Sequence, residues 1–326
     1  MATKKLLITG ERRTGTTLIA NFLNAQKGIT IYRDFLHLER MRQGLVGISL
    51  TDSLSPTQRL QLIHCFNGWN ADLGFQVDLD PEQFSSLAEF YRYVLNLIAR
   101  PGDRIVGHKT TMAHRTVDEL LEHVPDLQVI YILRDPRDVV ASALKRFADE
   151  ENTLFDYIEG WQRSYLKMRS LITNPDFAGR IFMLRYEDFV LGRDQVLPYL
   201  AEFLEVEKLV VPEEMTDYGQ SWLSNSAFGD LKQTLDPTPV GRWREENPRA
   251  GRVAEILLAP EMLQVGYEVS ADINNDEKAR VQHQYMQHCL ARAGFRIDPP
   301  RRPERVGSPG LNALKSSCDA ILAPTL

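Results

Sequence analysis

An anion-binding loop is the first chemistry that this sequence offers. Lys5 to Phe22 read KLLITGERRTGTTLIANF, in which a short apolar run ends at Gly10, a basic loop follows, and an amphipathic segment opens after Gly15. A strand, a glycine-bounded loop and a helix N-terminus in this order form an anion site, because backbone N–H groups and the positive end of the helix dipole both face the loop. The stretch therefore predicts a site for a phosphate or a similar group.

The loop differs from the ATP-binding version at one decisive position. Two glycines separated by four residues have the spacing of a nucleotide P-loop, which places a lysine after the second glycine to reach the β- and γ-phosphates. Thr16 occupies that position here, and the positive charge lies upstream at Arg12 and Arg13. The loop is therefore poorly suited to Mg-ATP. A P-loop kinase, which would also need a magnesium-holding carboxylate after a strand, is the weaker interpretation.

A buried strand followed by a helix is predicted for residues 128–147, QVIYILRDPRDVVASALKRF. The continuous apolar run that ends at Leu133 is typical of a strand buried on both faces, and Asp-Pro then begins a helix. Arg134 thus lies at the carboxyl end of the strand, and Ser142 lies two turns into the helix. Arginine offers a planar fork and serine a small donor, and phosphate oxygens can accept from both, but this segment alone favours a capped crossover helix with a solvated arginine.

Together the two motifs resemble those of sulfotransferases that use 3′-phosphoadenosine 5′-phosphosulfate (PAPS). The sulfonate-binding loop of that family reads basic-(Ser/Thr)-Gly-Thr-Thr. The matching residues here are Arg13, Thr14, Gly15, Thr16 and Thr17. The resemblance implies that Arg13 neutralises the leaving oxygen, that Thr16 and Thr17 hold the 5′-phosphate, and that Arg134 and Ser142 grip the 3′-phosphate. Arg12 is expected to play a less direct part.

Two later segments agree with this resemblance. Arg185–Phe189 resembles the family's Tyr-Glu-Asp-Leu element, and Gly241–Arg244 resembles its Gly-x-Trp-(Lys/Arg) loop. The further cofactor contacts that the resemblance implies are Tyr186, Ser226, Phe228, Gly241, Arg242, Trp243 and Arg244. The cytosolic branch has Arg-Lys-Gly shortly before Gly-x-Trp, but this chain has Asp-Pro-Thr at 236–238. A third cation for the 3′-phosphate would then come from Arg242 or Arg244.

The general base is the least determined group. Cytosolic relatives use a histidine in Lys-Thr-His-Leu-Pro, and Thr111 stands at that position here. Tyrosylprotein sulfotransferases place a glutamate 21 residues beyond the loop arginine, and Asp34 lies there. A carboxylate near several arginines has a lowered pKa, which weakens it as a base unless it is desolvated. Asp34 is the first candidate and His108 the second, and Lys109 resembles the family's lysine near the sulfonate. The remaining alternatives are His37, Glu39 and His114.

The resemblance implies an in-line transfer of a sulfonate group from PAPS, with adenosine 3′,5′-bisphosphate as the product. The protein must position the reactants, neutralise the bridging oxygen and accept a proton, as in phosphoryl transfer. No metal is expected, and the acceptor is expected to be a hydroxyl or amine of a small molecule. A sugar, a lipid, a polyketide, a peptidyl tyrosine and a specialised metabolite all remain open. A non-catalytic nucleotide-binding protein of the same fold is a further alternative, although the presence of both Arg13 and Lys109 argues against it.

Apolar runs and helical patterns alternate along the chain, which predicts βαβ units. We expect strands near 5–9, 29–32, 104–107, 128–133 and 181–185, and helices over 15–26, 83–99, 114–123, 136–147 and 276–293. The fold class is therefore α/β, a P-loop-like three-layer fold with a central parallel sheet flanked by helices. Ligands of such sheets bind beyond the carboxyl ends of the strands. A helical stripe from Leu154 to Ile172, which includes Trp161 and Tyr165, is interpreted as core.

Residues 1–270 are expected to form the sulfotransferase domain, with 41–82 as a substrate-side insertion or lid and 271–326 as a C-terminal helix and a Pro-rich tail.

A net charge of −6 and the absence of a basic tract argue against nucleic acid as a partner. Three widely spaced cysteines make a disulfide framework improbable and favour a reducing compartment. The sequence has no signal peptide and no run of about 18 apolar residues, so we expect a cytoplasmic protein that does not engage a membrane.

Overall fold

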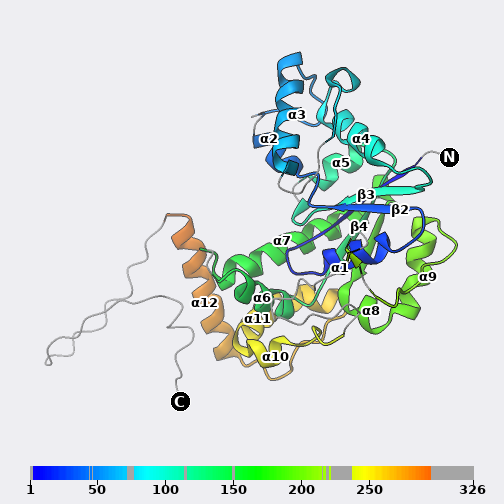
Figure 1. Ribbon diagram of the computed structural model, residues 1–326. Coiled ribbons are helices and arrows are strands. Elements are labelled where there is room, and N and C mark those ends of the chain that lie inside the picture. The colour runs from blue at the N-terminus through cyan, green and yellow to red at the C-terminus, as the bar shows by residue number, and fades with distance from the viewer. Residues whose placement is uncertain are drawn as a thin grey trace, which may run out of the picture.

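The computed structural model describes residues 3–43, 45, 47–71, 77–113, 116–148, 151–214, 216–217, 220–221 and 237–294. At its centre lies a parallel sheet of five strands in the order β2-β3-β1-β4-β5. The strands are β1 (Lys4–Gly10), β2 (Ile29–Arg33), β3 (Ile105–Lys109), β4 (Leu127–Leu133) and β5 (Ile181–Arg185). Helices cover both faces of this sheet (Figure 1). The predicted α/β class with a central parallel sheet is therefore confirmed.

Alternate residues of the strands supply two separate cores, as strands covered on both faces must. Leu7, Val106 and Val129 belong to the larger cluster, whereas Leu6 and Ile8 belong to the smaller one. The smaller cluster is completed by α1 (Thr16–Asn24), α8 (Tyr186–Leu191) and α9 (Arg193–Leu204). The larger cluster is completed by α2 (Leu38–Gln43), α3 (Pro56–Ala71), α4 (Leu87–Ile98), α5 (Val117–His123), α6 (Pro136–Arg146), α7 (Leu154–Thr173) and α11 (Pro248–Gln264).

The remaining elements are short or peripheral. They are the 3₁₀ turns η1 (Pro81–Gln83) and η3 (Pro175–Phe177), the antiparallel pair β6 (Thr216–Asp217) and β7 (Gln220–Ser221), α10 (Trp243–Glu246) and α12 (Asn275–Arg292). In Figure 1, α2 to α5 form a group beside β2 and β3, and α12 lies at the opposite side of the molecule. Val281 is the one described residue of α12 that is buried.

Side-chain caps explain where several helices begin. Ser86 accepts from the N–H of Glu89 at the start of α4, so this helix begins at Leu87 rather than at the predicted residue 83. Thr153 forms a capping box with Asp156 at the start of α7.

The core stripe predicted for α7 is right for Trp161 and Tyr165 but wrong at its end. Ile172 is 47% exposed, and the neighbouring Leu171 is buried instead.

Residues 41–82 contribute to the core as well as to the surface. Leu62 and Phe66 of α3 are fully buried in the larger cluster, where Phe66 packs edge-on against Phe35 and Phe90. The packing anchors this segment beside β2 and β3. Its predicted role as a substrate-side insertion or lid stays a prediction.

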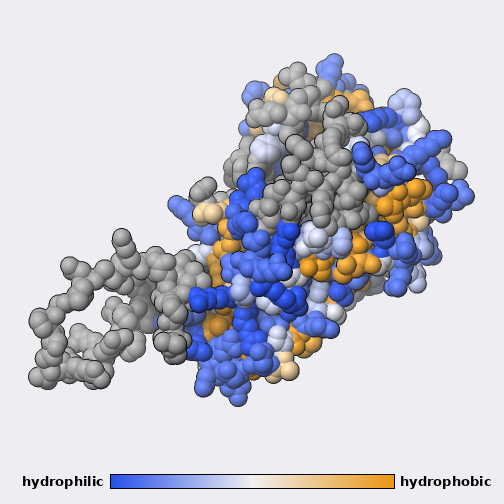
Figure 2. All heavy atoms as spheres, turned by 60° about the horizontal axis from the view of Figure 1, so that its bottom comes forward, coloured by the Kyte–Doolittle hydropathy of each residue, from blue (hydrophilic) through white to orange (hydrophobic). Residues whose placement is uncertain are grey.

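The face shown in Figure 2 is mostly hydrophilic among the described residues, and its hydrophobic residues form separate groups. Within the described ranges, no helix is long and apolar enough to cross a membrane. The described cysteines, Cys65 and Cys289, are free thiols.

Candidate active site

The loop between β1 and α1 has the backbone that the sequence predicts for an anion site. Gly15 lies in the left-handed region (φ 95°) and caps α1, and a Cβ on it would lie 2.4 Å from the ring of Tyr186. Glycine is therefore required for both conformation and space. Helix α1 begins with no side-chain cap and with no acidic residue in its first turn. Its N-terminal dipole is thus not offset by a local carboxylate.

Three residues that the resemblance assigns to the leaving oxygen and the 3′-phosphate, Arg13, Arg134 and Ser142, lie together. The Arg13 Nε donates to Ser142 Oγ at 3.0 Å, and one guanidinium N–H of Arg134 donates to the Arg13 carbonyl at 3.1 Å. The Arg134 guanidinium also lies over the Tyr186 ring, 4.5 Å from its centroid. The ends of β1 and β4 and the first turns of α6 therefore form one cationic cluster.

The cluster carries a surplus of positive charge. Burial, followed by repulsion from Arg134 and Arg146, lowers the pKa of Arg13 to about 10. Arginine ordinarily titrates above 12, so this pKa reflects a buried guanidinium that has two others near it. An anion would relieve that repulsion. Arg146 was missed from the sequence, although it follows Ser142 by four residues and so shares its face of α6.

The loop before α10 is held against α6 by the carboxylate of Asp138. The backbone N–H groups of Gly241 and Trp243 donate to Asp138 at 2.7 and 2.9 Å, and Arg134 donates to the Pro239 carbonyl at 2.7 Å. Gly241 has a φ of 74°. The sequence indicates Asp138 only as a favourable charge at the start of a helix. In the structure, Asp138 holds this loop beside Arg134.

The other predicted cofactor contacts are distributed around this cluster. Trp243 is 8% exposed, lies 4.8 Å from the guanidinium groups of both Arg137 and Arg244, and packs against Gly251. Arg12 lies over the ring of Phe147. Thr14, Thr16 and Thr17 follow the loop into α1, and Arg242 precedes α10. Ser226, Phe228 and the alternative base His114 lie outside the described residues.

A second polar group lies at the ends of β2 and β3. Asp34 adopts a left-handed backbone (φ 51°), and its N–H donates to the Lys109 carbonyl at 2.7 Å. The Lys109 Nζ donates to both oxygens of Asp34, at 2.9 and 3.2 Å, and His37 Nε2 lies 3.6 Å from Asp34 Oδ1. The structure thus brings together Asp34 and Lys109, two of the four predicted catalytic residues, and adds His37.

Opposing effects set the charge of Asp34. Burial raises its pKa, but the hydrogen bond from His37 and the charge and hydrogen bonds of Lys109 outweigh burial, so the pKa falls from 3.8 to about 2. Asp34 is therefore ionised at any pH at which an enzyme is ordinarily assayed. A carboxylate held this strongly in its charged form is a weak proton acceptor.

His108 has a different environment from the other candidate bases. Its side chain is 1% exposed, and its Nε2 lies 2.9 Å from the hydroxyl of Tyr91. Burial, followed by repulsion from His37, lowers its pKa from 6.5 to about 3. His108 is consequently neutral near pH 7, and it is enclosed by protein. This geometry does not favour it as the group that meets the acceptor.

The burial of His108 predicts an acid-sensitive stability. Between about pH 6.5 and pH 3 the unfolded chain binds a proton at this position that the folded chain does not, so folding weakens as the pH falls, by at most about 1.4 kcal/mol per pH unit from this group. We expect His108→Gln to have a shallower loss of unfolding free energy between pH 7 and pH 5 than the wild type, measured by denaturant titration. His64→Gln, at an exposed position of α3, should keep the wild-type slope. Equal slopes in all three proteins would contradict the prediction.

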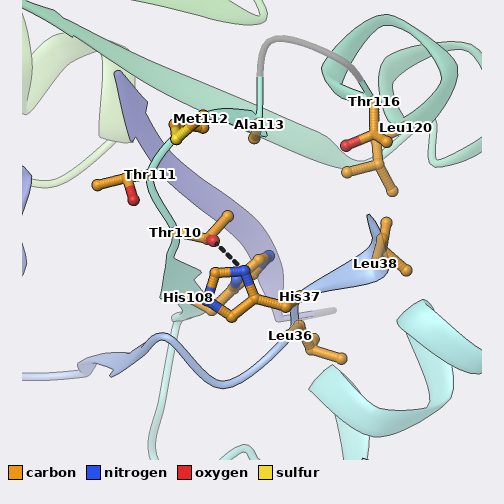
Figure 3. A pocket seen from close by; sticks show the side chains of 10 residues that line it. All are labelled: Leu36, His37, Leu38, His108, Thr110, Thr111, Met112, Ala113, Thr116 and Leu120. Carbon is orange, nitrogen blue, oxygen red and sulfur yellow. Dashed lines mark hydrogen bonds between the residues drawn. The ribbon is translucent and has the colours of Figure 1, made fainter. Parts of the chain in front are cut away.

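A small cavity of about 30 Å³ lies beside this second group (Figure 3). Its walls are Leu36, His37, Leu38, His108, Thr110, Thr111, Met112, Ala113, Thr116 and Leu120. The volume is enough for water-sized groups. His37 and Thr110 are joined across it by a hydrogen bond of 3.0 Å between Nδ1 and Oγ1.

The parallel sheet, the glycine-bounded loop and the cationic cluster at the carboxyl ends of the strands define a P-loop-like protein that handles an anionic group. A family model described as "Sulfotransferase family" matches residues 6–209. The chain belongs to this family and is a sulfotransferase, an enzyme that transfers a sulfonate group. The matched residues include the loop, both phosphate motifs, Asp34 and Lys109.

Solved structures of sulfotransferases are similar at low identity. The sulfotransferase domain from the curacin biosynthetic pathway is 17% identical, covers 91% of this chain and 99% of its own, and has a TM-score of 0.48. The sulfotransferase domain of the Synechococcus PCC 7002 olefin synthase is 16% identical, with 87% and 95% covered and a TM-score of 0.48. A mouse sulfotransferase complexed with PAP is 13% identical, with 87% and 89% covered and a TM-score of 0.43. None of the curated proteins compared with this chain matches it. These similarities are too distant to assign residues to ligands.

Proposed function

We propose that this sulfotransferase takes its sulfonate group from PAPS and transfers it to a hydroxyl or amine of a small-molecule acceptor. The observation that carries the proposal is the cationic cluster of Arg13, Arg134 and Arg146 beside the uncapped start of α1. PAPS has phosphate groups at the 3′ and 5′ positions of its ribose as well as the sulfonate, and a site for it needs several cations close together. Arg134 also pairs with Asp138 at 4.0 Å. The pair of phosphate motifs in the sequence supports the same ligand.

Each group of the site has a task in this reaction. Arg134 and Ser142 hold the 3′-phosphate, while Thr16, Thr17 and the N–H groups at the start of α1 hold the 5′-phosphate. Arg13 stabilises the negative charge that develops on the bridging oxygen as the bisphosphate leaves. Lys109 lies at the end of the neighbouring strand β3 and is assigned to the sulfonate oxygens. The loop at Gly241–Arg244, tied to α6 by Asp138, covers the nucleotide.

The ligand is tested by thermal unfolding. Adenosine 3′,5′-bisphosphate or PAPS should stabilise the protein without added Mg²⁺, by roughly 2.7 kcal/mol at 100 times the Kd. ATP should stabilise it poorly, because Thr16 stands where a lysine would reach the β- and γ-phosphates. Equal stabilisation by Mg-ATP would instead support the kinase interpretation.

The 3′-phosphate assignment predicts a loss of affinity in Arg134→Ala. A guanidinium that holds a phosphate with two hydrogen bonds is not replaced by water without cost, so the Kd for the bisphosphate should rise about tenfold or more. Ser142→Ala should have a milder effect. Isothermal titration calorimetry measures both, with Arg163→Ala as the control, since Arg163 is an exposed residue of α7 that pairs with Glu159. Unchanged affinity in Arg134→Ala would remove this assignment.

A further inference from the structure

His37 has the contacts of an oriented histidine. Its Nδ1 lies 3.0 Å from Thr110 Oγ1, and its Nε2 lies 3.6 Å from Asp34 Oδ1 on the other side of the ring. The ring also packs edge-on against Trp69, with 5.5 Å between centroids and 82° between planes. The side chain is 19% exposed and lines the cavity of Figure 3. His37 is thus fixed in orientation and still accessible.

The two ring nitrogens have unequal neighbours, which defines a direction for proton transfer. With its proton on Nδ1, the imidazole donates to the Thr110 hydroxyl, which fixes the ring, and the lone pair of Nε2 is left for the proton of an acceptor. The Asp34 carboxylate lies 3.6 Å from Nε2 and faces the positive charge that protonation places on the ring. A histidine held by a hydrogen bond at one nitrogen, with its other nitrogen beside a carboxylate, is an arrangement that can activate a nucleophile.

Neither of the first two candidate bases has this combination. The Asp34 carboxylate receives two contacts from Lys109 Nζ, and its pKa of about 2 makes it a weak acceptor. His108 also lines the cavity, but it is 1% exposed and its Nε2 is paired with the hydroxyl of Tyr91. Asp34 is, however, well placed to stabilise a positive charge that forms on His37, because it remains ionised.

We propose that His37 is the catalytic base of the sulfonate transfer. Thr110 positions its ring, and Asp34 stabilises the positive charge that forms on His37. This inference rests on the proposed function. The O–H bond of the acceptor breaks and its proton goes to Nε2 of His37, while the acceptor oxygen forms a bond to sulfur. The bond between sulfur and the bridging oxygen breaks, and its electron pair leaves with the bisphosphate beside Arg13. The imidazolium that results is stabilised by Asp34.

The charged and titratable groups that face His37 make the pH profile informative. They are Asp34 from the end of β2, Lys109 and His108 from β3, with Thr110 and the indole of Trp69 as uncharged neighbours. Above pH 5 Asp34 stays ionised and His108 stays neutral. Neither of these two groups therefore produces a fall of kcat between pH 8 and pH 5, and an acid limb in that range comes from another group.

The test measures kcat for His37→Gln and the wild type from pH 5 to 8, with PAPS saturating and with the phenol or alcohol that the wild type sulfonates fastest in a screen with radiolabelled PAPS. We expect kcat at pH 7.5 to fall roughly 10²–10⁴-fold, the acid limb to disappear, and the affinity for the bisphosphate to stay within about twofold. In His37→Gly, added imidazole should restore part of the rate. His64→Gln is the matched control, because His64 is an exposed histidine of α3.

Thr110→Val separates positioning from proton transfer. It removes the hydroxyl but keeps the shape of the side chain, so kcat should fall about tenfold while the acid limb persists and imidazole has no effect.

Wild-type kcat and an intact acid limb in His37→Gln would overturn the inference while leaving the proposed function in place. A wild-type protein that neither binds the bisphosphate nor transfers sulfonate from PAPS would overturn the proposed function itself. Binding of the bisphosphate by each variant shows that it is folded.

Discussion

Arg13→Ala should lower kcat by roughly 10²–10³-fold while weakening the binding of the bisphosphate far less. The Arg13 guanidinium is buried near Arg134 and Arg146, and burial, followed by repulsion from these two residues, lowers its pKa to about 10. Such a group interacts most strongly with the oxygen that becomes anionic as the sulfonate departs. The loss of one donor to a developing oxyanion typically costs a factor of this size.

The measurement is a comparison of kcat with the Kd of the bisphosphate in the same variant. Arg13 has a left-handed backbone (φ 69°), and alanine carries the same Cβ, so the substitution adds no new backbone strain. Arg13→Lys should recover part of the rate, because it restores the charge but loses the Nε contact to Ser142. Wild-type turnover in Arg13→Ala would remove Arg13 from the mechanism. Weaker binding of the bisphosphate with an unchanged kcat would make it a binding residue only.

The strands and the phosphate motifs could be predicted because local physics determines them. Strands of a parallel sheet are buried on both faces and are therefore continuous apolar runs, such as Val129–Leu133. Asp135 and Pro136 mark the start of α6, and the cap is observed at the N–H of Arg137. Once the strand ends were known, Arg13 and Arg134 had to meet, because the carboxyl ends of β1 and β4 are adjacent.

The parts that could not be predicted depend on contacts between distant segments. Nothing local to His37 indicates that Thr110 lies 3.0 Å from it, since the hydrogen bond joins positions 73 residues apart. The low pKa of Asp34 likewise requires Lys109, which comes from another strand. The enclosure of His108 depends on Tyr91 of α4 and on the packing around it. Sequence spacing placed these groups at one edge of the sheet but could not rank them as bases.

Asp34→Asn should lower kcat by roughly 10²–10⁴-fold while PAPS still binds. Asparagine keeps the size and hydrogen-bonding shape of the side chain, but it can neither accept a proton nor stabilise a positive charge on His37. The ion pair with Lys109 is also lost, at Nζ–O distances of 2.9 and 3.2 Å in the structure. Wild-type turnover in this variant would contradict every role for Asp34 in the reaction.

The double variant Asp34→Asn/His37→Gln decides whether the two residues act as one unit. Residues that perform a single step together have non-additive effects, so the double variant should lose no more kcat than about the worse single variant. If Asp34 accepted the proton itself, neither the wild type nor His37→Gln would show an acid limb between pH 5 and 8, because a carboxylate with a pKa of about 2 does not titrate in that range. Multiplicative losses in the double variant would show independent roles. Asp34 would then serve the site through Lys109 rather than through His37.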